Sequence, residues 1–199
     1  MNDEHLRCQL LDMAAEDARV REHLLAAGTL GEGYHPEMEA VHVRHGERLG
    51  RIMDECGWPT PDRVGEDGAR AAWLVAQHAI SLPRVQRQAL ALIEAAATVG
   101  GADPRHAVLL ADRIAFNEDR PQALGTVLDW DDRGEITMPA VTDPDTVDDR
   151  RRALGLAPLA TAVAEARADA AREGLEPPSD PAAKRHARAA WARRTGWRP

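Results

Sequence analysis

Apolar residues recur with helical spacing along most of the chain, and segments rich in glycine or proline separate the periodic stretches. The pattern predicts helices over residues 3–27, 36–56, 67–80, 82–99 and 104–117. Short helices are expected to begin at residues 144 and 158, and a last one spans 182–194. Residues 28–33 are predicted to form a glycine-rich loop, and 176–181 form a proline-rich linker.

The pattern changes character between residues 121 and 141, where two short runs read as strands. Leu124–Trp130 and Ile136–Val141 flank a turn that contains Gly134, as in a β-hairpin. The predicted fold is therefore mainly α, a helical bundle with a small β-hairpin near residues 124–141 and a C-terminal helical tail. The predicted domains are a bundle over residues 1–175 and, over 176–199, a linker and basic helix docked on that body.

Composition supports a helical, globular chain. Of the 199 residues, 44% are apolar and only 4% are aromatic, which favours closely packed helices over a β-sandwich.

The charge is unevenly distributed along the chain. The formal net charge is −8, but residues 182–199 carry six basic and no acidic residues, which leaves 33 acidic against 19 basic residues in the rest. Because so acidic a body repels phosphate backbones, the charge disfavours nucleic-acid binding. We expect Trp191, Trp197 and the tail arginines to pack on the body, with an acidic partner or nucleic acid as the alternative.

Targeting and cofactor motifs are absent from the sequence. The N-terminus is acidic where a secretory signal is basic, and no apolar run approaches the ~18 residues that span a bilayer, so we expect a cytoplasmic protein without membrane partners. No glycine-rich phosphate loop follows a predicted strand, so no nucleotide cofactor is expected. Cys8 and Cys56 are far apart, which predicts two reduced, mostly buried thiols without a disulfide or a cysteine zinc site.

Candidate chemistry gathers on the predicted helix 36–56. One face carries an apolar stripe into which histidines are set, and it comprises His35, Met38, His42, His45, Leu49, Ile52 and Cys56. Glu39 precedes His42 by three residues, the spacing with which helical bundles present a carboxylate and an imidazole to one metal. The end of the stripe that carries the histidines lies beside the glycine-rich loop, an arrangement typical of a pocket mouth. We expect His35 at this mouth.

A single metal ion needs a further ligand from another helix, and His78 is the best candidate because apolar residues surround it. Glu39, His42 and His78 would form a two-histidine, one-carboxylate site for one divalent ion, iron or zinc. A dinuclear site is disfavoured, because the only further approximation to Glu-x-x-His runs from Asp103 to His106, and Asp103 is expected to cap a helix. This hypothesis describes an enzyme acting on a small-molecule substrate.

Two other hypotheses remain open. In the first, the same pocket is metal-free and uses His78 or His42 as a general base, oriented by Gln77 or Glu39, or simply binds a ligand. In the second, the chain is a non-catalytic interaction protein whose tail recruits a partner. Monomer and homodimer are both compatible with the sequence.

A longer set of motifs resembles an uncharacterised bacterial family known only as a domain of unknown function. The matching residues are Gly57-Trp58-Pro59-Thr60, Val64-Gly65, Ala72-Trp73-Leu74, Gln77-His78-Ala79, Gln86, Asp112-Arg113, Pro121-Gln122, Gly125-Thr126, Asp143-Pro144, Val147-Asp148, Arg151 and Leu154-Gly155-Leu156. The chain departs from the family pattern at Leu124 and Val127. The resemblance implies a mostly helical fold and a polar site around Gln77, His78 and Gln122, and it implies no particular reaction.

Overall fold

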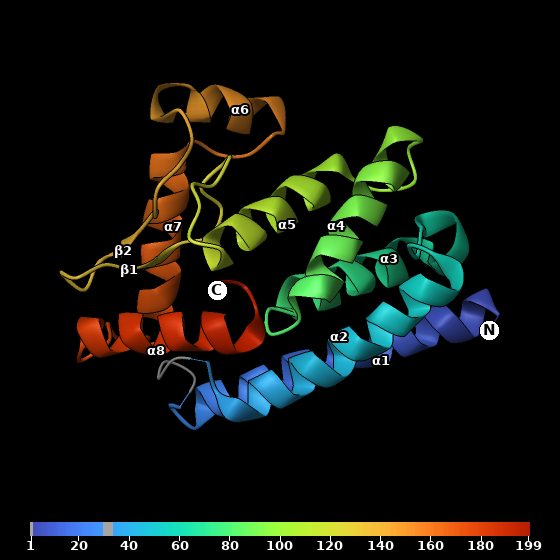
Figure 1. Cartoon of the computed structure of the whole chain (residues 1–199), viewed down its shortest axis with the longest axis horizontal. Coiled ribbons are helices and arrows are strands. Elements are labelled where there is room, and N and C mark those ends of the chain that lie inside the picture. The colour runs from blue at the N-terminus through green and yellow to red at the C-terminus, as the bar shows by residue number, and fades with distance from the viewer. Residues whose placement is uncertain (1, 30–33) are drawn as a thin grey trace. The chain divides into compact units, whose positions relative to one another are not determined.

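The computed structural model describes residues 2–29 and 34–199, and it is mainly helical, with one short antiparallel hairpin (Figure 1). In chain order the elements are α1 (Asp3–Ala26), α2 (Pro36–Cys56), α3 (Pro61–His78), α4 (Pro83–Thr98), α5 (Pro104–Asn117), β1 (Asp129–Trp130), β2 (Ile136–Thr137), the 3₁₀ turn η1 (Pro144–Thr146), α6 (Val147–Ala153), α7 (Leu159–Arg172) and α8 (Pro181–Thr195). The predicted fold class is confirmed. Residues 30–33 of the predicted loop lie outside the described residues.

The chain divides into two compact units, and the division falls within α5. In its described part, the first unit comprises residues 2–29 and 34–110, with α1 to α4 and the first half of α5. The second comprises residues 111–199, with the rest of α5, the hairpin and α6 to α8. The basic helix α8 thus shares a unit with the hairpin, whereas the sequence predicts a boundary near residue 176.

The first unit is built around α1, which packs against both α2 and α3, while α4 also packs against α2 and α3. Its core contains fully buried apolar side chains from several helices, among them Leu10 of α1, Leu49 and Ile52 of α2 and Ile93 of α4. Removing these side chains from water is the main favourable contribution to folding. Across the described residues, no helix combines the length and apolarity that a membrane crossing requires.

Prolines mark where several helices begin. α2 and α5 start at Pro36 and Pro104 and end at Cys56 and Asn117, as predicted. α3 begins at Pro61, earlier than the predicted start near residue 67, but its backbone leaves helical geometry at Gly65, so the helix that follows Gly65 begins close to the predicted start. Gly65, with φ 72° and ψ 164°, then kinks the helix.

The predicted hairpin is confirmed, but its strands are shorter than predicted. β1 pairs with β2 in the register Asp129↔Thr137 and Trp130↔Ile136. Upstream, the carboxylate of fully buried Asp112 accepts the backbone N–H groups of Ala123 (2.6 Å), Leu124 (3.1 Å to Oδ2) and Thr126 (3.0 Å). Because these N–H groups bond to Asp112, this segment forms a loop instead of the start of a strand.

The tail helix α8 bonds to other parts of the second unit. Lys184 and Arg188 pair with Asp129, while the Arg188 guanidinium carbon lies 3.5 Å from the centre of the Phe116 ring. Trp197 is only 5% exposed. Within the second unit, the basic residues of the tail therefore meet carboxylates and an aromatic ring, and one of its tryptophans is buried.

Candidate functional site

A buried aspartate on α1 meets two histidines from neighbouring helices. Asp17 is 5% exposed, and its Oδ2 lies 2.8 Å from Nε2 of His42 on α2 and 2.7 Å from Nδ1 of His78 at the end of α3. The two imidazole rings are 4.9 Å apart between centroids. The three donor atoms all lie within 4.8 Å of one another, which is the one such group of metal-ligand type among the described residues.

Helical periodicity explains why these side chains face inward. On α1, Asp17 follows Met13 by four residues and Leu10 by seven, so it lies on the same buried stripe. On α2, the predicted stripe is confirmed from Met38 through His42 and His45, all buried. His78 is the last residue of α3, and its side chain keeps 31% exposure. The cluster is therefore buried at Asp17 and His42 and open to solvent at His78.

Asp17 is ionised at neutral pH. Burial raises the pKa of its carboxyl group, but the interactions with His42 and His78 outweigh burial and hold the pKa well below its usual range. His78 Nδ1 donates to Oδ2 at 2.7 Å. His42 Nε2 lies 2.8 Å from the same oxygen, so Asp17 faces both imidazoles.

A second layer of polar groups surrounds His42. Tyr34 Oη lies 2.8 Å from His42 Nδ1, within hydrogen-bond distance, so the phenol holds the ring nitrogen that faces away from Asp17. One turn further along α2, Nε2 of the buried His45 lies 2.9 Å from Glu16 Oε2, and Arg44 pairs with the other Glu16 oxygen. Hydrogen bonds from His45 and then Arg44 lower the pKa of Glu16. Two adjacent carboxylates of α1 thus each hold an imidazole of α2.

The other predicted site residues have different partners. Glu39 accepts a hydrogen bond from Ser81 at 2.6 Å and is not part of the cluster. His35 caps α2, where its Nδ1 accepts the backbone N–H of Glu37 at 3.2 Å. The side chain of Gln77 is buried, and its backbone oxygen accepts a hydrogen bond from Gln86. Of the predicted ligands, the structure brings together His42 and His78.

Gln122 belongs to the second unit and is fully buried. Its amide donates to the backbone oxygen of Val127 at 2.9 Å and accepts the N–H of the same residue at 2.8 Å. A side chain saturated in this way holds its own loop closed.

The prediction of buried thiols is wrong. Cys8 and Cys56 are both exposed and free. Cys56 lies at the C-terminal end of α2, where the helix stops at Gly57, so the stripe that is buried at Ile52 no longer has a neighbour to cover it. Both thiols are accordingly surface groups rather than parts of the site.

A carboxylate and two imidazoles in this geometry can act in two ways. With the shared protons removed, two nitrogens and one oxygen can bind a single borderline metal ion. With the protons in place, the aspartate orients and supports the imidazoles for proton transfer. Both uses need an opening to substrate, which the partial exposure of His78 provides.

The comparisons with other proteins extend the resemblance seen in the sequence. No curated protein and no solved structure gives a significant match. A family model matches residues 4–170, which include the whole cluster and most of both units. The chain therefore belongs to DUF6624, a family of unknown function.

Proposed function

We propose that Asp17, His42 and His78 bind one divalent transition-metal ion, zinc or iron(II), and that the protein is a metal-dependent enzyme acting on a small molecule. The observation that supports this proposal is the convergence of one ionised carboxylate and two imidazole nitrogens from three helices, all within 4.8 Å of one another. In this proposal Asp17 takes the place of Glu39 in the ligand set expected from the sequence.

The donor set suits such an ion. Two imidazoles and one carboxylate form the set used by non-haem iron enzymes, and three protein ligands with an open position are typical of catalytic zinc. A metal held in this way polarises a bound substrate or lowers the pKa of a bound water. A substrate would reach the ion through the part of the His78 side chain, 31% of its surface, that is exposed to solvent.

The distances of the cluster determine what binding would require. Bonds of about 2.0–2.1 Å in a tetrahedral zinc site place ligand atoms about 3.3 Å apart. In the cluster they are 2.7 and 2.8 Å apart, so each nitrogen has to move away from the Asp17 oxygen by roughly half an ångström. His78 also has to free Nδ1, and a neutral imidazole does so by moving its proton to Nε2. Because a doubly protonated imidazole cannot bind a metal, we expect metal binding to weaken as pH falls.

The environment of His42 supports a role as a ligand. When His42 carries its proton on Nδ1, the lone pair of the buried Nε2 faces Asp17 and can be directed at an ion. In that tautomer Nδ1 carries the proton and donates to Tyr34 Oη, which lies 2.8 Å away. Outer-shell bonds of this kind orient metal-bound imidazoles, and their loss lowers affinity about 10- to 100-fold. Tyr34→Phe is expected to do the same.

Calorimetry on protein purified without a histidine tag tests the metal site. Wild type is titrated with zinc and, under anaerobic conditions, with iron(II), and its metal content is measured as purified. Asp17→Asn and His78→Gln are expected to weaken binding at least about 100-fold, because each removes one of three ligands. Glu39→Gln is the matched control and is expected to bind as wild type does.

Three results would contradict the metal site. The first is that wild type binds no metal at micromolar concentration. The others are that Glu39→Gln weakens binding as much as Asp17→Asn does, or that Asp17→Asn binds as tightly as wild type. Catalysis is tested separately by incubating wild type with and without metal, metal-loaded Glu39→Gln and Asp17→Asn with a mixture of small metabolites and following their consumption by mass spectrometry. Consumption that depends on both metal and Asp17 is expected, and its absence would refute the enzymatic part alone.

A metal-free acid–base site is the second candidate function. It is favoured by the fact that one oxygen of Asp17 lies within hydrogen-bond distance of both imidazole nitrogens, an arrangement that needs no metal to be satisfied. In that case the same metabolite consumption survives treatment with EDTA but is lost in His78→Gln.

A further inference from the structure

A cavity lies beside the first half of α3, in the first unit, and it shares no residue with the Asp17 cluster. Its volume is about 440 Å³, within the range of roughly 300–1,000 Å³ that is typical of small-molecule sites. Glu66 and Trp73 line it from α3, whereas His78 lies at the other end of that helix. The cavity is therefore a second candidate site, independent of the proposed metal site.

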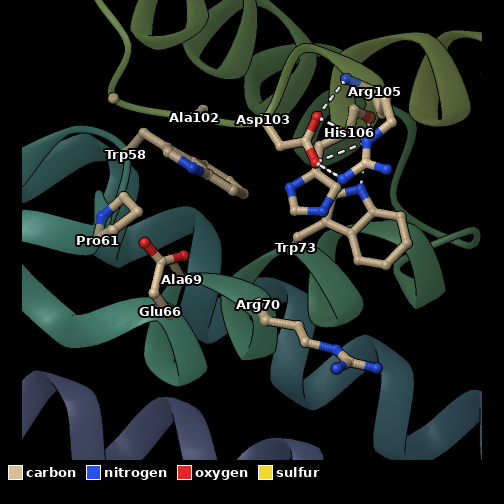
Figure 2. Close-up of a pocket in the computed structure, with 11 residues that line it drawn as sticks. Trp58, Pro61, Glu66, Ala69, Arg70, Trp73, Ala102, Asp103, Arg105 and His106 are labelled. Carbon is tan, nitrogen blue, oxygen red and sulfur yellow. Dashed lines mark hydrogen bonds and ion pairs between the residues drawn. The ribbon is translucent and has the colours of Figure 1, made fainter. Parts of the chain in front are cut away.

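Aromatic rings form its walls. His106 is stacked on Trp73, with ring centroids 4.4 Å apart and planes 13° from parallel. Figure 2 shows the indole of Trp58 projecting into the cavity from the side opposite to this pair. Aromatic side chains on two sides of a cavity favour an aromatic ligand, which they can contact by offset stacking or edge to face.

The charges around the cavity balance. Glu66 and Asp103 contribute two carboxylates, and Arg70 and Arg105 contribute two guanidinium groups, of which Arg105 bonds to Asp103 at 2.5 and 2.8 Å. Burial lowers the pKa of His106, although Asp103 opposes this effect, so its imidazole is neutral at pH 7. No net charge remains to select a strongly charged ligand.

We propose that this cavity binds a neutral, flat heteroaromatic ring of nucleobase size, stacked between Trp58 and the pair formed by His106 and Trp73. Glu66 lines the same cavity, and its carboxylate can accept a hydrogen bond from a polar substituent of the ring. A phosphorylated ligand needs an excess of positive charge, which the balanced rim does not supply, and a quaternary ammonium ion, which aromatic walls can also bind, is the competing ligand in the test.

The test uses adenosine as the probe, with binding to the full chain measured by saturation-transfer NMR and calorimetry at pH 7.5. Wild type is expected to bind adenosine, and to bind AMP, choline and the saturated ring of cyclohexanol more weakly. His106→Ala removes one wall and is expected to weaken binding about 5- to 150-fold, the affinity equivalent of one base stacked on an aromatic side chain.

Ala102→Leu adds volume at the edge of the cavity and is expected to weaken binding without removing any wall. His5→Ala, on the exposed face of α1, is the matched control for a lost histidine and should bind as wild type does. Circular dichroism shows whether each variant is folded. The proposal is overturned if adenosine does not bind at millimolar concentration, if AMP or choline binds more tightly, or if folded His106→Ala and Ala102→Leu both keep wild-type affinity.

Discussion

Gly46 of α2 packs closely against the residues that directly follow α3, and this glycine offers a test of the cluster's geometry. A Cβ atom added at Gly46 would lie 2.7 Å from Leu82 Cδ1 and 2.8 Å from Ala79 Cβ. Ala79 directly follows His78, and Gly46 lies one turn after His42. The missing side chain at Gly46 thus makes room for Ala79 and Leu82 against α2, next to the place where the two histidines meet.

Gly46→Ala is expected to destabilise the protein by about 1–2 kcal/mol. Overpacking a well-packed core lowers the free energy of unfolding by about 1–3 kcal/mol, whereas replacing glycine by alanine inside a helix raises it by about 0.5–1 kcal/mol. Gly50, one turn further along α2, is the matched control, because a Cβ there would lie 3.4 Å from Val85 Cγ2 and meet no closer atom. Gly50→Ala is expected to leave stability unchanged or to raise it by up to about 1 kcal/mol.

Urea unfolding followed by circular dichroism measures both free energies, and zinc titration measures the effect on the cluster. Gly46→Ala should lower zinc affinity as well as stability, since moving Ala79 away from α2 carries His78 away from His42. Gly50→Ala should change neither quantity by this route. Equal stability of the two variants would refute the close approach of α2 and α3, and lower stability with unchanged zinc affinity would refute its link to the cluster.

Three further predictions concern other parts of the chain. Asp112→Asn places an amide among backbone N–H donors and is expected to lower the free energy of unfolding by about 2–4 kcal/mol in urea titrations; a change below about 0.5 kcal/mol would count against the loop clamp. Arg188→Ala loses the Phe116 contact and should cost about 1–2 kcal/mol, against less than about 0.5 kcal/mol for exposed Arg193→Ala, and equal costs would contradict the docking of α8. Burial lowers the pKa of His106, so its contribution to stability is present above about pH 6.5 and is lost as pH falls below that value. Between pH 7.5 and 5, wild type should therefore lose more stability than His106→Gln does. Equal losses in the two proteins would show that His106 is not buried as described.

Local sequence signals predicted the helices well where proline and glycine bound them. Pro36 and Gly57 enclose α2, and the structure confirms both of its predicted ends. The same signals were ambiguous between Pro61 and Asp67, because two start signals occur within seven residues and Gly65 allows a kink between them. The long predicted strand failed for a non-local reason, since the carboxylate of Asp112 binds the backbone N–H groups that a strand would have paired.

Several residues that carried the family resemblance have contacts that explain why they occur together. Asp112 bonds to the backbone and hydroxyl of Thr126, Gln122 bonds to Val127, and the buried Arg151 donates to the backbone oxygen of Leu124 at 2.7 Å. These side chains all hold the same loop in the second unit. Spacing in the sequence could not separate this structural role from a role in chemistry, because a buried polar residue is expected in both.

Asp17 shows which part of the cluster the sequence contains and which part it lacks. Its place on the apolar stripe of α1 is visible in the spacing from Leu10 and Met13, and a carboxylate at such a position has to find partners inside the protein, since burying it alone is costly. Glu39 has the more familiar spacing from His42, but neighbours on a helix surface need not share its buried face. Periodicity therefore identifies Asp17 as a residue in need of buried partners. Which histidines it meets depends on how far α1 is shifted and rotated against α2 and α3, and the spacing of residues within one helix does not specify this register.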